Sequence, residues 1–199
     1  MTNLGSIAEI RMGATLRGRD ATRPVPNGRF QLIRIGDISQ DGNLLTKNLN
    51  SIAPNESVSQ GLLLRSGDVL FPNRGNRTTA LVYRLEQTNI IVGAQFFILR
   101  PDISQVLPEY LGWFLRTEAA AKYFDGRRRG TTVQIIQRRD LVELEMPLPS
   151  LDVQKRIVEL AELAITERNL TEKLAGRKWK LVNDQILQAA RNLSSEKNL

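Results

Sequence analysis

Short apolar segments, broken by Gly, Pro, Asn and Asp, make up most of the first 150 residues. Segments of this kind are typical of β-strands, and we expect strands at 7–12, 30–35, 68–71, 79–85, 90–99 and 141–146. The run at 90–99 is almost continuously apolar around Gly93, which predicts a single central strand with a bend or bulge. The long polar intervals 13–29 and 37–59 are expected to be surface loops.

A helical pattern interrupts these strands at 108–123. Pro108 suits the first turn of a helix, Glu109 suits the positive end of the helix dipole, and apolar residues follow at helical spacing. We expect Trp113 and Tyr123 to pack in the core rather than to stack on a ligand, because aromatic residues on amphipathic helices usually do so. The helix leads directly into a segment rich in arginine at 126–138.

The pattern changes at Pro147 and Pro149, since paired prolines disfavour both helix and sheet interiors. From Asp152 to about Asn192 the chain has no proline and one glycine, and Ser150 or Asp152 can cap a helix. A helix of about 40 residues would be about 60 Å long. We therefore predict an α+β fold, with a globular domain at 1–150 built of mixed short strands and helices, and a long C-terminal coiled-coil helix at 151–199.

This long helix carries leucines at spacings of three, four and seven, with Glu167 and Arg177 as polar interruptions. The leucines are Leu160, Leu163, Leu170, Leu174 and Leu181. This imperfect heptad pattern predicts a coiled coil. A helix of that length cannot bury its stripe against one domain, so we expect it to pair with another long helix, from a second copy of the chain. Folding back on its own domain is the alternative.

The composition narrows the classes of partner and of chemistry. A formal charge of +7 and a pI near 10.1 favour a polyanionic partner, with nucleic acid as the first candidate. The chain has no cysteine and no histidine, which excludes disulfides, thiolate nucleophiles, imidazole bases and the usual zinc sites. The longest uncharged stretch, 87–99, is too short and too polar to span a bilayer, so we expect a soluble cytoplasmic protein without a membrane partner.

The segment at 126–138 has four arginines, two hydroxyls and two amides, and no acid. Arginine matches a phosphate or the guanine edge, glutamine can pair with adenine, and hydroxyls contact phosphates. We expect a DNA-binding surface here, formed by Arg127, Arg128, Arg129, Thr131, Thr132 and Gln134. The loop at 72–78 supplies second candidates, and the loop after the first strand supplies third ones: Arg74, Asn76 and Arg77, then Arg17 and Arg19. A solvated arginine loop without function is the alternative.

Patterns expected of DNA-acting enzymes are missing from the sequence. No lysine has an acid two positions earlier, as restriction-type nucleases need, and no Asn-Pro-Pro-aromatic methyltransferase loop or Gly-Lys phosphate loop occurs. We expect no catalytic residues, no cofactor and no metal, although a site made of carboxylates alone stays open. Asp37, Asp68 and Asp140 are interpreted as turn or cap residues.

Three stretches together resemble the specificity subunits of type I restriction-modification enzymes. Residues 4–10 followed by Gly13 resemble the opening of a target recognition domain, and 67–71 leading to Arg74 and Gly75 resemble its middle motif. The most specific match runs from 130–133 through 140–141 and 147–149 to 154–158, and resembles the junction between such a domain and the long helix of the family.

The resemblance implies a non-catalytic subunit that acts in DNA methylation and phage defence. Its globular part would read half of a split target in double-stranded DNA, and its helix would act as a ruler and a dock for methyltransferase subunits. Whether restriction subunits join is left open. Family members usually carry two recognition domains, so this chain would be half a subunit, completed by a second copy or by a separately encoded half. A stand-alone dimeric DNA-binding regulator and a protein-interaction adaptor are the alternatives.

Overall fold

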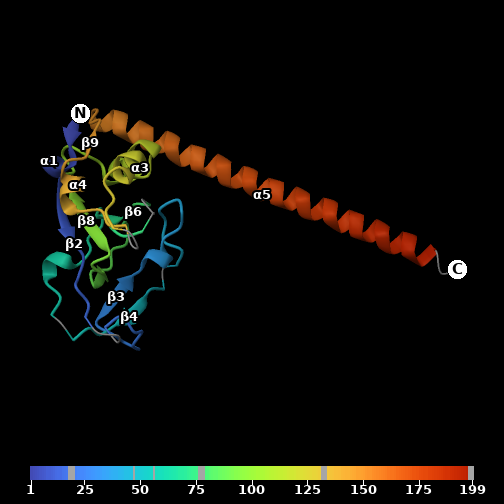
Figure 1. Cartoon of the computed structure of the whole chain (residues 1–199), viewed down its shortest axis with the longest axis horizontal. Coiled ribbons are helices and arrows are strands. Elements are labelled where there is room, and N and C mark those ends of the chain that lie inside the picture. Colours follow the sequence, from blue (N-terminus) through green and yellow to red (C-terminus); the bar gives the residue numbers. More distant parts are fainter. Residues whose placement is uncertain (18–20, 47, 56, 76–78, 131–133, 197–199) are drawn as a thin grey trace. The chain divides into compact units, whose positions relative to one another are not determined.

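The computed structural model describes residues 1–17, 21–46, 48–55, 57–75, 79–130 and 134–196. By their internal contacts these form two compact units, Met1–Val158 and Glu159–Leu199. The first unit holds short strands and helices, and the second is part of one long helix (Figure 1). The predicted α+β fold class with a long C-terminal helix is confirmed.

Most strands of the globular unit lie in two sheets. The four-stranded sheet is antiparallel and has the order β2 (Ala8–Met12), β8 (Phe96–Pro101), β5 (Val69–Pro72) and β6 (Leu81–Val82). The three-stranded sheet has β3 (Phe30–Ile33) at its centre, antiparallel to β4 (Asn50–Ile52) and parallel to β7 (Ile90–Val92). A separate pair joins β1 (Thr2–Asn3) to β9 (Glu145–Met146).

The apolar run at 90–99 forms two strands, so the prediction of one bent strand is wrong. Its first part, β7, pairs with β3, and its second part, β8, lies between β2 and β5 in the other sheet. The chain turns at Gly93, whose carbonyl accepts a hydrogen bond from the Phe96 amide at 3.0 Å. Gly93 also forms an isolated bridge with buried Ala14. The interval 37–59 likewise contains a strand, β4, that its polar composition did not predict.

The predicted helix at 108–123 is two helices, α2 (Pro108–Leu115) and α3 (Glu118–Asp125). Thr117 causes the break, because its hydroxyl donates to the Phe114 carbonyl at 2.7 Å and accepts from the Ala120 amide at 3.3 Å, which caps α3. The predicted strand at 141–146 is also wrong, since α4 takes its first residues and β9 its last. The remaining short helices are α1 (Leu4–Ile7) and α4 (Arg138–Val142), with 3₁₀ turns at Ile35–Asp37 and Gln60–Leu62.

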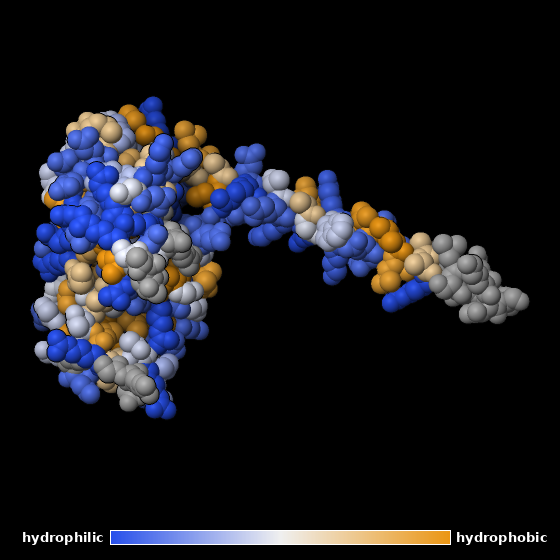
Figure 2. All heavy atoms as spheres, in the orientation of Figure 1, coloured by the Kyte–Doolittle hydropathy of each residue, from blue (hydrophilic) through white to orange (hydrophobic). Residues whose placement is uncertain are grey.

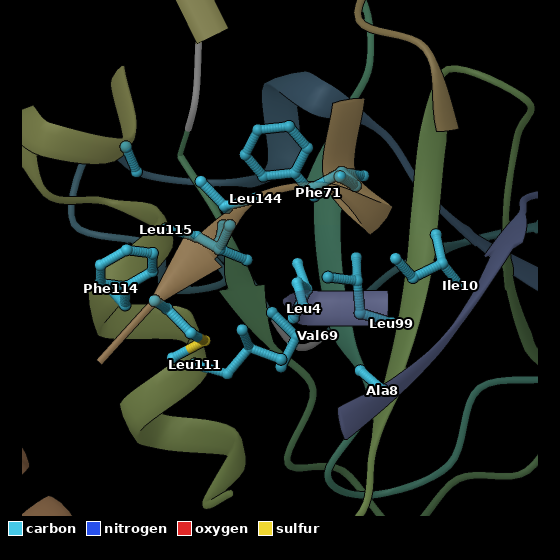
Figure 3. Close-up of a cluster of buried hydrophobic side chains, with 14 of the residues drawn as sticks. Leu4, Ala8, Ile10, Val69, Phe71, Leu99, Leu111, Phe114, Leu115 and Leu144 are labelled. Atoms are coloured by element: carbon cyan, nitrogen blue, oxygen red, sulfur yellow. The ribbon is translucent and has the colours of Figure 1, made fainter. Parts of the chain in front are cut away.

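The four-stranded sheet is buried on both faces. Along β5 and β8, Val69, Phe71, Phe97 and Leu99 pack in one apolar cluster, while Leu70, Phe96 and Ile98 pack in another. Side chains on a strand alternate between faces, so each strand contributes to both clusters. The first cluster lies between the sheet and α1, α2 and α3 (Figure 3), and Trp113 and Tyr123 pack against it as predicted. This core fixes the position of the segment that follows α3.

The three aspartates interpreted as turn or cap residues are confirmed in that role. The side chains of Asp37, Asp68 and Asp140 accept hydrogen bonds from backbone amides three residues earlier, at 2.7 to 2.9 Å. Asp68 does more, because it is buried and forms two 2.8 Å hydrogen bonds with the Arg100 guanidinium. The hydrogen bond to Asp68 raises the pKa of Arg100 above its ordinary value.

The long helix α5 (Leu151–Glu196) begins inside the globular unit. The buried Gln154 side chain anchors it: its amide nitrogen donates to the carbonyls of Gln105 and Pro149, and its oxygen accepts from the Leu107 amide, all at 2.9 Å. Ile157 and Val158 then pack against the first cluster. These contacts give a physical reason for the sequence pattern at 154–158 that resembles a domain junction. None of the helices in the part of the chain that the structure describes is long and apolar enough to cross a membrane.

Candidate nucleic-acid interface

Two segments that the sequence marked separately, the loop after β5 and the arginine-rich loop after α3, lie side by side. The Gly75 amide donates to the Gln134 carbonyl at 3.0 Å, and the Ile136 amide donates to the Asn73 carbonyl at 2.9 Å. Arg129 and Ile135 exchange backbone hydrogen bonds of 3.1 and 2.8 Å. The segments 73–75, 127–130 and 134–137 therefore form one hydrogen-bonded surface, which we call the loop ladder.

Local sequence explains how the loop ladder is held. At the end of α3 the carbonyl of buried Phe124 accepts from the amides of Arg127 and Arg128, both at 2.9 Å, which turns the chain out of the helix. Gly75 and Gly130 have φ angles of 80° and 108°, which side chains disfavour. Buried Ile136 fixes the returning segment to the core. The ladder is thus a defined surface and not a free loop.

Arg127 is exposed but held in place. Its guanidinium lies 3.7 Å from the centre of the Tyr123 ring and donates to the Tyr123 carbonyl at 3.4 Å. The Tyr123 hydroxyl in turn donates to the Asp140 carbonyl at 3.0 Å, and burial raises the pKa of this tyrosine. A stacked arginine loses less freedom on binding, because its plane is already oriented. The arrangement suits recognition of a phosphate or a base edge.

Arg128 differs from the neighbouring arginines, because it is buried where the sequence predicted an exposed side chain on the DNA face. Its side chain is only 3% exposed, donates to the Gly75 carbonyl, and bonds to Asp125 at 3.1 Å. Its guanidinium thus joins two loops in the interior of this surface. Arg128 therefore braces the loop ladder from inside.

Three further predicted residues of the loop ladder are exposed: Arg74, Arg129 and Gln134. The Arg129 guanidinium donates to the side-chain oxygen of Gln137 at 3.4 Å. Arg17 is exposed as well, but Leu16 beside it packs against the cluster of the three-stranded sheet, so this loop belongs to another part of the unit. Arg19, Asn76, Arg77, Thr131 and Thr132 lie outside the described residues.

Sequence reasoning did not select Arg138 and Arg139, which directly follow the loop ladder and are exposed. Arg138 donates to the Ile10 carbonyl at 2.9 Å, and Arg139 lies 3.9 Å from Asp140. Both stand in the first turn of α4, where Asp140 accepts from the Gln137 amide. The Gln137-to-Asp140 spacing was the available signal for a helix start next to the arginine segment. Within the described residues, no group of three or more acidic side chains is arranged to hold a metal ion.

The second unit offers a different kind of surface. All five leucines of the predicted seam are exposed, between 54% and 66%: Leu160, Leu163, Leu170, Leu174 and Leu181. Beyond Gly176 a second exposed apolar stripe, formed by Trp179, Val182 and Ile186, follows at spacings of three and four. Figure 2 shows apolar side chains at the surface of this helix, between hydrophilic ones. Each stripe is of the kind that a second helix covers.

Comparison with known proteins agrees with this organisation. A family model for the type I restriction modification DNA specificity domain matches residues 1–173. Comparison with curated protein sequences gives no significant match. Among solved structures, the chain is similar to one from a study of complex assembly and conformational transition of the type I R-M system, with a TM-score of 0.61 and 22% identity over 83% of this chain.

Two other solved structures are similar. One is the HsdS subunit from Thermoanaerobacter tengcongensis, with a TM-score of 0.59 and 21% identity over 83% of this chain. The other is the type I restriction-modification S subunit from M. genitalium, with a TM-score of 0.53 and 17% identity over 81% of this chain. The chain spans 37% to 38% of the length of these three chains. At these identities the likeness establishes the fold, while the family model carries the assignment: the chain belongs to the type I restriction-modification DNA specificity domain family.

Proposed function

We propose that the globular unit reads one half of a bipartite target in double-stranded DNA and directs methyltransferase subunits to it. The observation that carries this proposal is the loop ladder, where segments distant in sequence bring Arg74, Arg127 and Arg129 to one exposed surface. Exposed arginines on a fixed backbone suit contacts with guanine edges and phosphates. Gln134 adds a group able to pair with adenine.

The proposed contact set differs from the sequence expectation at Arg128, which supports the loops from inside. Arg138 and Arg139 join it, because they continue the exposed basic surface beyond Gln137. Thr131, Thr132, Asn76 and Arg77 stay in the proposal through their neighbours in sequence. Arg17 stays as a weaker candidate, since Leu16 beside it packs against the cluster of the three-stranded sheet. Arg19 stays as a weaker candidate through its neighbours in sequence.

Selection of duplexes from a random library by the purified chain tests this proposal. We expect a defined half-site, and then expect alanine at Arg74, Arg127 or Arg129 to act in one of two ways. Loss of a base contact should cost about 1–3 kcal/mol and relax one position, while loss of a phosphate contact should weaken all sequences and reduce the salt slope by about one. Arg65→Ala, which removes the same charge from the turn before β5, is the matched control. Unchanged affinity and salt slope in all three variants would rule out the loop ladder as the DNA surface.

The long helix, in this proposal, joins two recognition units and receives the methyltransferase subunits. Its leucine seam would pair with a second helix, from another copy or from a separately encoded half. Its Trp179 stripe, which is separate from the seam, would be the dock for methyltransferase subunits. Trp179→Ala should therefore reduce the amount of methyltransferase that co-purifies from the native host and leave pairing of the chain intact. If Trp179→Ala instead abolished pairing of the chain and left methyltransferase recovery unchanged, the stripe would be the pairing surface and the seam would be the dock.

A further inference from the structure

Between Leu163 and Leu181 the leucine seam of α5 is symmetric in its charges as well as in its leucines. The residues of the seam are separated alternately by three and four positions, and two of them are the polar residues Glu167 and Arg177. Both side chains are exposed, as are the seam leucines. The seam positions are Leu160, Leu163, Glu167, Leu170, Leu174, Arg177 and Leu181. A partner helix must therefore cover leucines and accommodate one acid and one base.

We infer that this partner is α5 of a second copy, running antiparallel, with the two-fold axis crossing the seam between Leu170 and Leu174, level with position 172. This inference rests on the helix pairing proposed above and names its occupant and register. Residues equidistant from position 172 then face each other, in the pairs Leu163 with Leu181, Glu167 with Arg177, and Leu170 with Leu174. Across these three layers each leucine meets a leucine and each charge meets its opposite, and in the next layer outward Leu160 faces Asp184.

Other alignments of the same two helices leave charges against the wrong neighbours. A shift by one heptad in one direction places Glu167 against Leu170 and Arg177 against Leu160. The opposite shift places Glu167 against Asp184. A parallel, in-register pair would stack Glu167 on Glu167 and Arg177 on Arg177. Since an unpaired charge at a helix interface is costly to desolvate, the register centred on Glu172 is favoured.

Self-complementarity also favours a second copy over a different half-subunit. The acid and the base that interrupt the seam satisfy each other only when both helices carry both residues, and one symmetric pairing then satisfies four charges. Arg168 and Glu172, an ion pair of 3.8 Å that the structure describes on this helix, belong to the same chain and lie off the seam. This pair stays exposed in this dimer and provides a control.

Cysteine cross-linking of the full chain tests the register, because the sequence contains no cysteine of its own. We expect a mixture of Leu163→Cys and Leu181→Cys chains, carrying different tags, to form a disulfide-linked heterodimer under mild oxidation. Neither variant alone should form a linked dimer. Linkage of Leu163→Cys to Leu174→Cys chains would indicate a heptad shift, and linkage of Leu163→Cys to itself would indicate parallel helices; either result overturns the inference.

Charge exchange provides a second, independent measurement. Glu167→Arg and Arg177→Glu should each weaken dimerisation by about tenfold or more, because each places like charges in two symmetric layers. The double variant should restore dimerisation, since the pair is then reversed on both chains. Arg168→Glu, outside the seam, should change dimerisation little. A double variant as weak as the singles, or a wild-type chain that remains monomeric at all concentrations, overturns the inference.

The same samples separate this inference from the proposed function. If the Leu163–Leu181 linked dimer forms but selects no DNA sequence, the register holds and the recognition proposal fails. If the chain selects a DNA sequence while cross-links form at other positions, recognition holds and the register fails. A linked dimer that selects an inverted pair of half-sites supports both.

Discussion

The two units of this chain use apolar residues in opposite ways. In the globular unit Val69, Phe71 and Leu99 are fully buried between a sheet and its helices, whereas Leu163 and Leu174 of the helix are more than half exposed. Ion pairs differ in the same way: Asp68 meets Arg100 in the interior, and Arg168 meets Glu172 in solvent. The globular unit buries most of its large apolar side chains within itself, while the helix presents apolar surfaces that a partner would cover. The exposed apolar residues of the helix are therefore the basis of the proposed pairing, whereas the buried apolar residues stabilise the fold of the globular unit.

The largest expected contrast is between Phe71→Ala and Leu174→Ala. Phe71 is fully buried with its ring centroid 4.9 Å from that of Phe124, so we expect alanine to cost about 3–5 kcal/mol of unfolding free energy. Leu174→Ala should leave unfolding of the globular unit unchanged and weaken dimerisation. Chemical denaturation at two protein concentrations separates these effects. A concentration-dependent loss in Phe71→Ala would contradict the contrast.

The two ion pairs give the next contrast, through Asp68→Asn and Glu172→Gln. Asparagine can still accept from the Arg65 amide but leaves the Arg100 guanidinium without its carboxylate, at a cost of about 3–5 kcal/mol. Glu172→Gln should change stability little, because both partners are exposed. Thermal unfolding of both variants measures the two losses of stability. Equal effects would mean that the interior pair is no stronger than the surface pair.

How far the sequence predicted the fold depends on whether each signal is local. The strands at 7–12, 30–35, 68–71 and 79–85, the helical pattern after Pro108 and the cap roles of the aspartates depend on near neighbours, and they were found. The split of the run at 90–99 was not found, because it depends on β3 pairing with the first half and on β2 and β5 pairing with the second. Apolar residues alone do not say which sheet each half joins. The break at Thr117 was missed because apolar spacing continues across it.

The candidate site shows the same limit at the level of single residues. Arg127, Arg128 and Arg129 are identical in type and adjacent, yet the structure exposes the first and last and buries the middle one. Asp125 lies three residues before Arg128 and is visible in the sequence, but the burial of Arg128 also depends on Gly75, which is 53 residues away along the chain. The sequence also did not predict that the loop after β5 and the loop after α3 lie side by side, although the composition of each had marked it as a candidate.

These adjacent arginines give a third contrast, through Arg128→Met and Arg129→Met. Methionine at 128 keeps much of the side-chain volume but removes the hydrogen bonds to Gly75 and Asp125, so we expect a loss of about 1–3 kcal/mol in stability. Methionine at 129 should leave stability unchanged and weaken DNA binding. Thermal unfolding and DNA titration are measured on both. A stable Arg128→Met variant with weakened binding would return Arg128 to the DNA face.

Alkaline pH should act on the globular unit through its tyrosines, because this unit holds all three of them. Burial, with the Asp68 charge, raises the pKa of Tyr83 to about 12 from 10.0. The folded state then keeps a proton that the unfolded chain releases, so stability falls by roughly 1–3 kcal/mol as pH rises from about 10 to 12. Tyr83→Phe should make this fall shallower, followed by circular dichroism and tyrosinate absorbance. A pH dependence identical to that of the wild-type chain would contradict the raised pKa.

The smallest effect is expected at Gly176, inside α5. A Cβ added at this residue meets no atom within 4 Å, and the position lies outside the leucine seam. Gly176→Ala should therefore stabilise the helix by up to about 1 kcal/mol, because alanine loses less backbone freedom on forming a helix. Ala175→Gly, its neighbour, should have the opposite effect of similar size. The helical signal is followed on heating, and Leu163–Leu181 cross-linking is repeated in the Gly176→Ala background. Cross-linking that persists agrees with a partner helix that leaves position 176 open. Cross-linking that disappears would mean that the partner passes directly over this glycine, and would require a different seam.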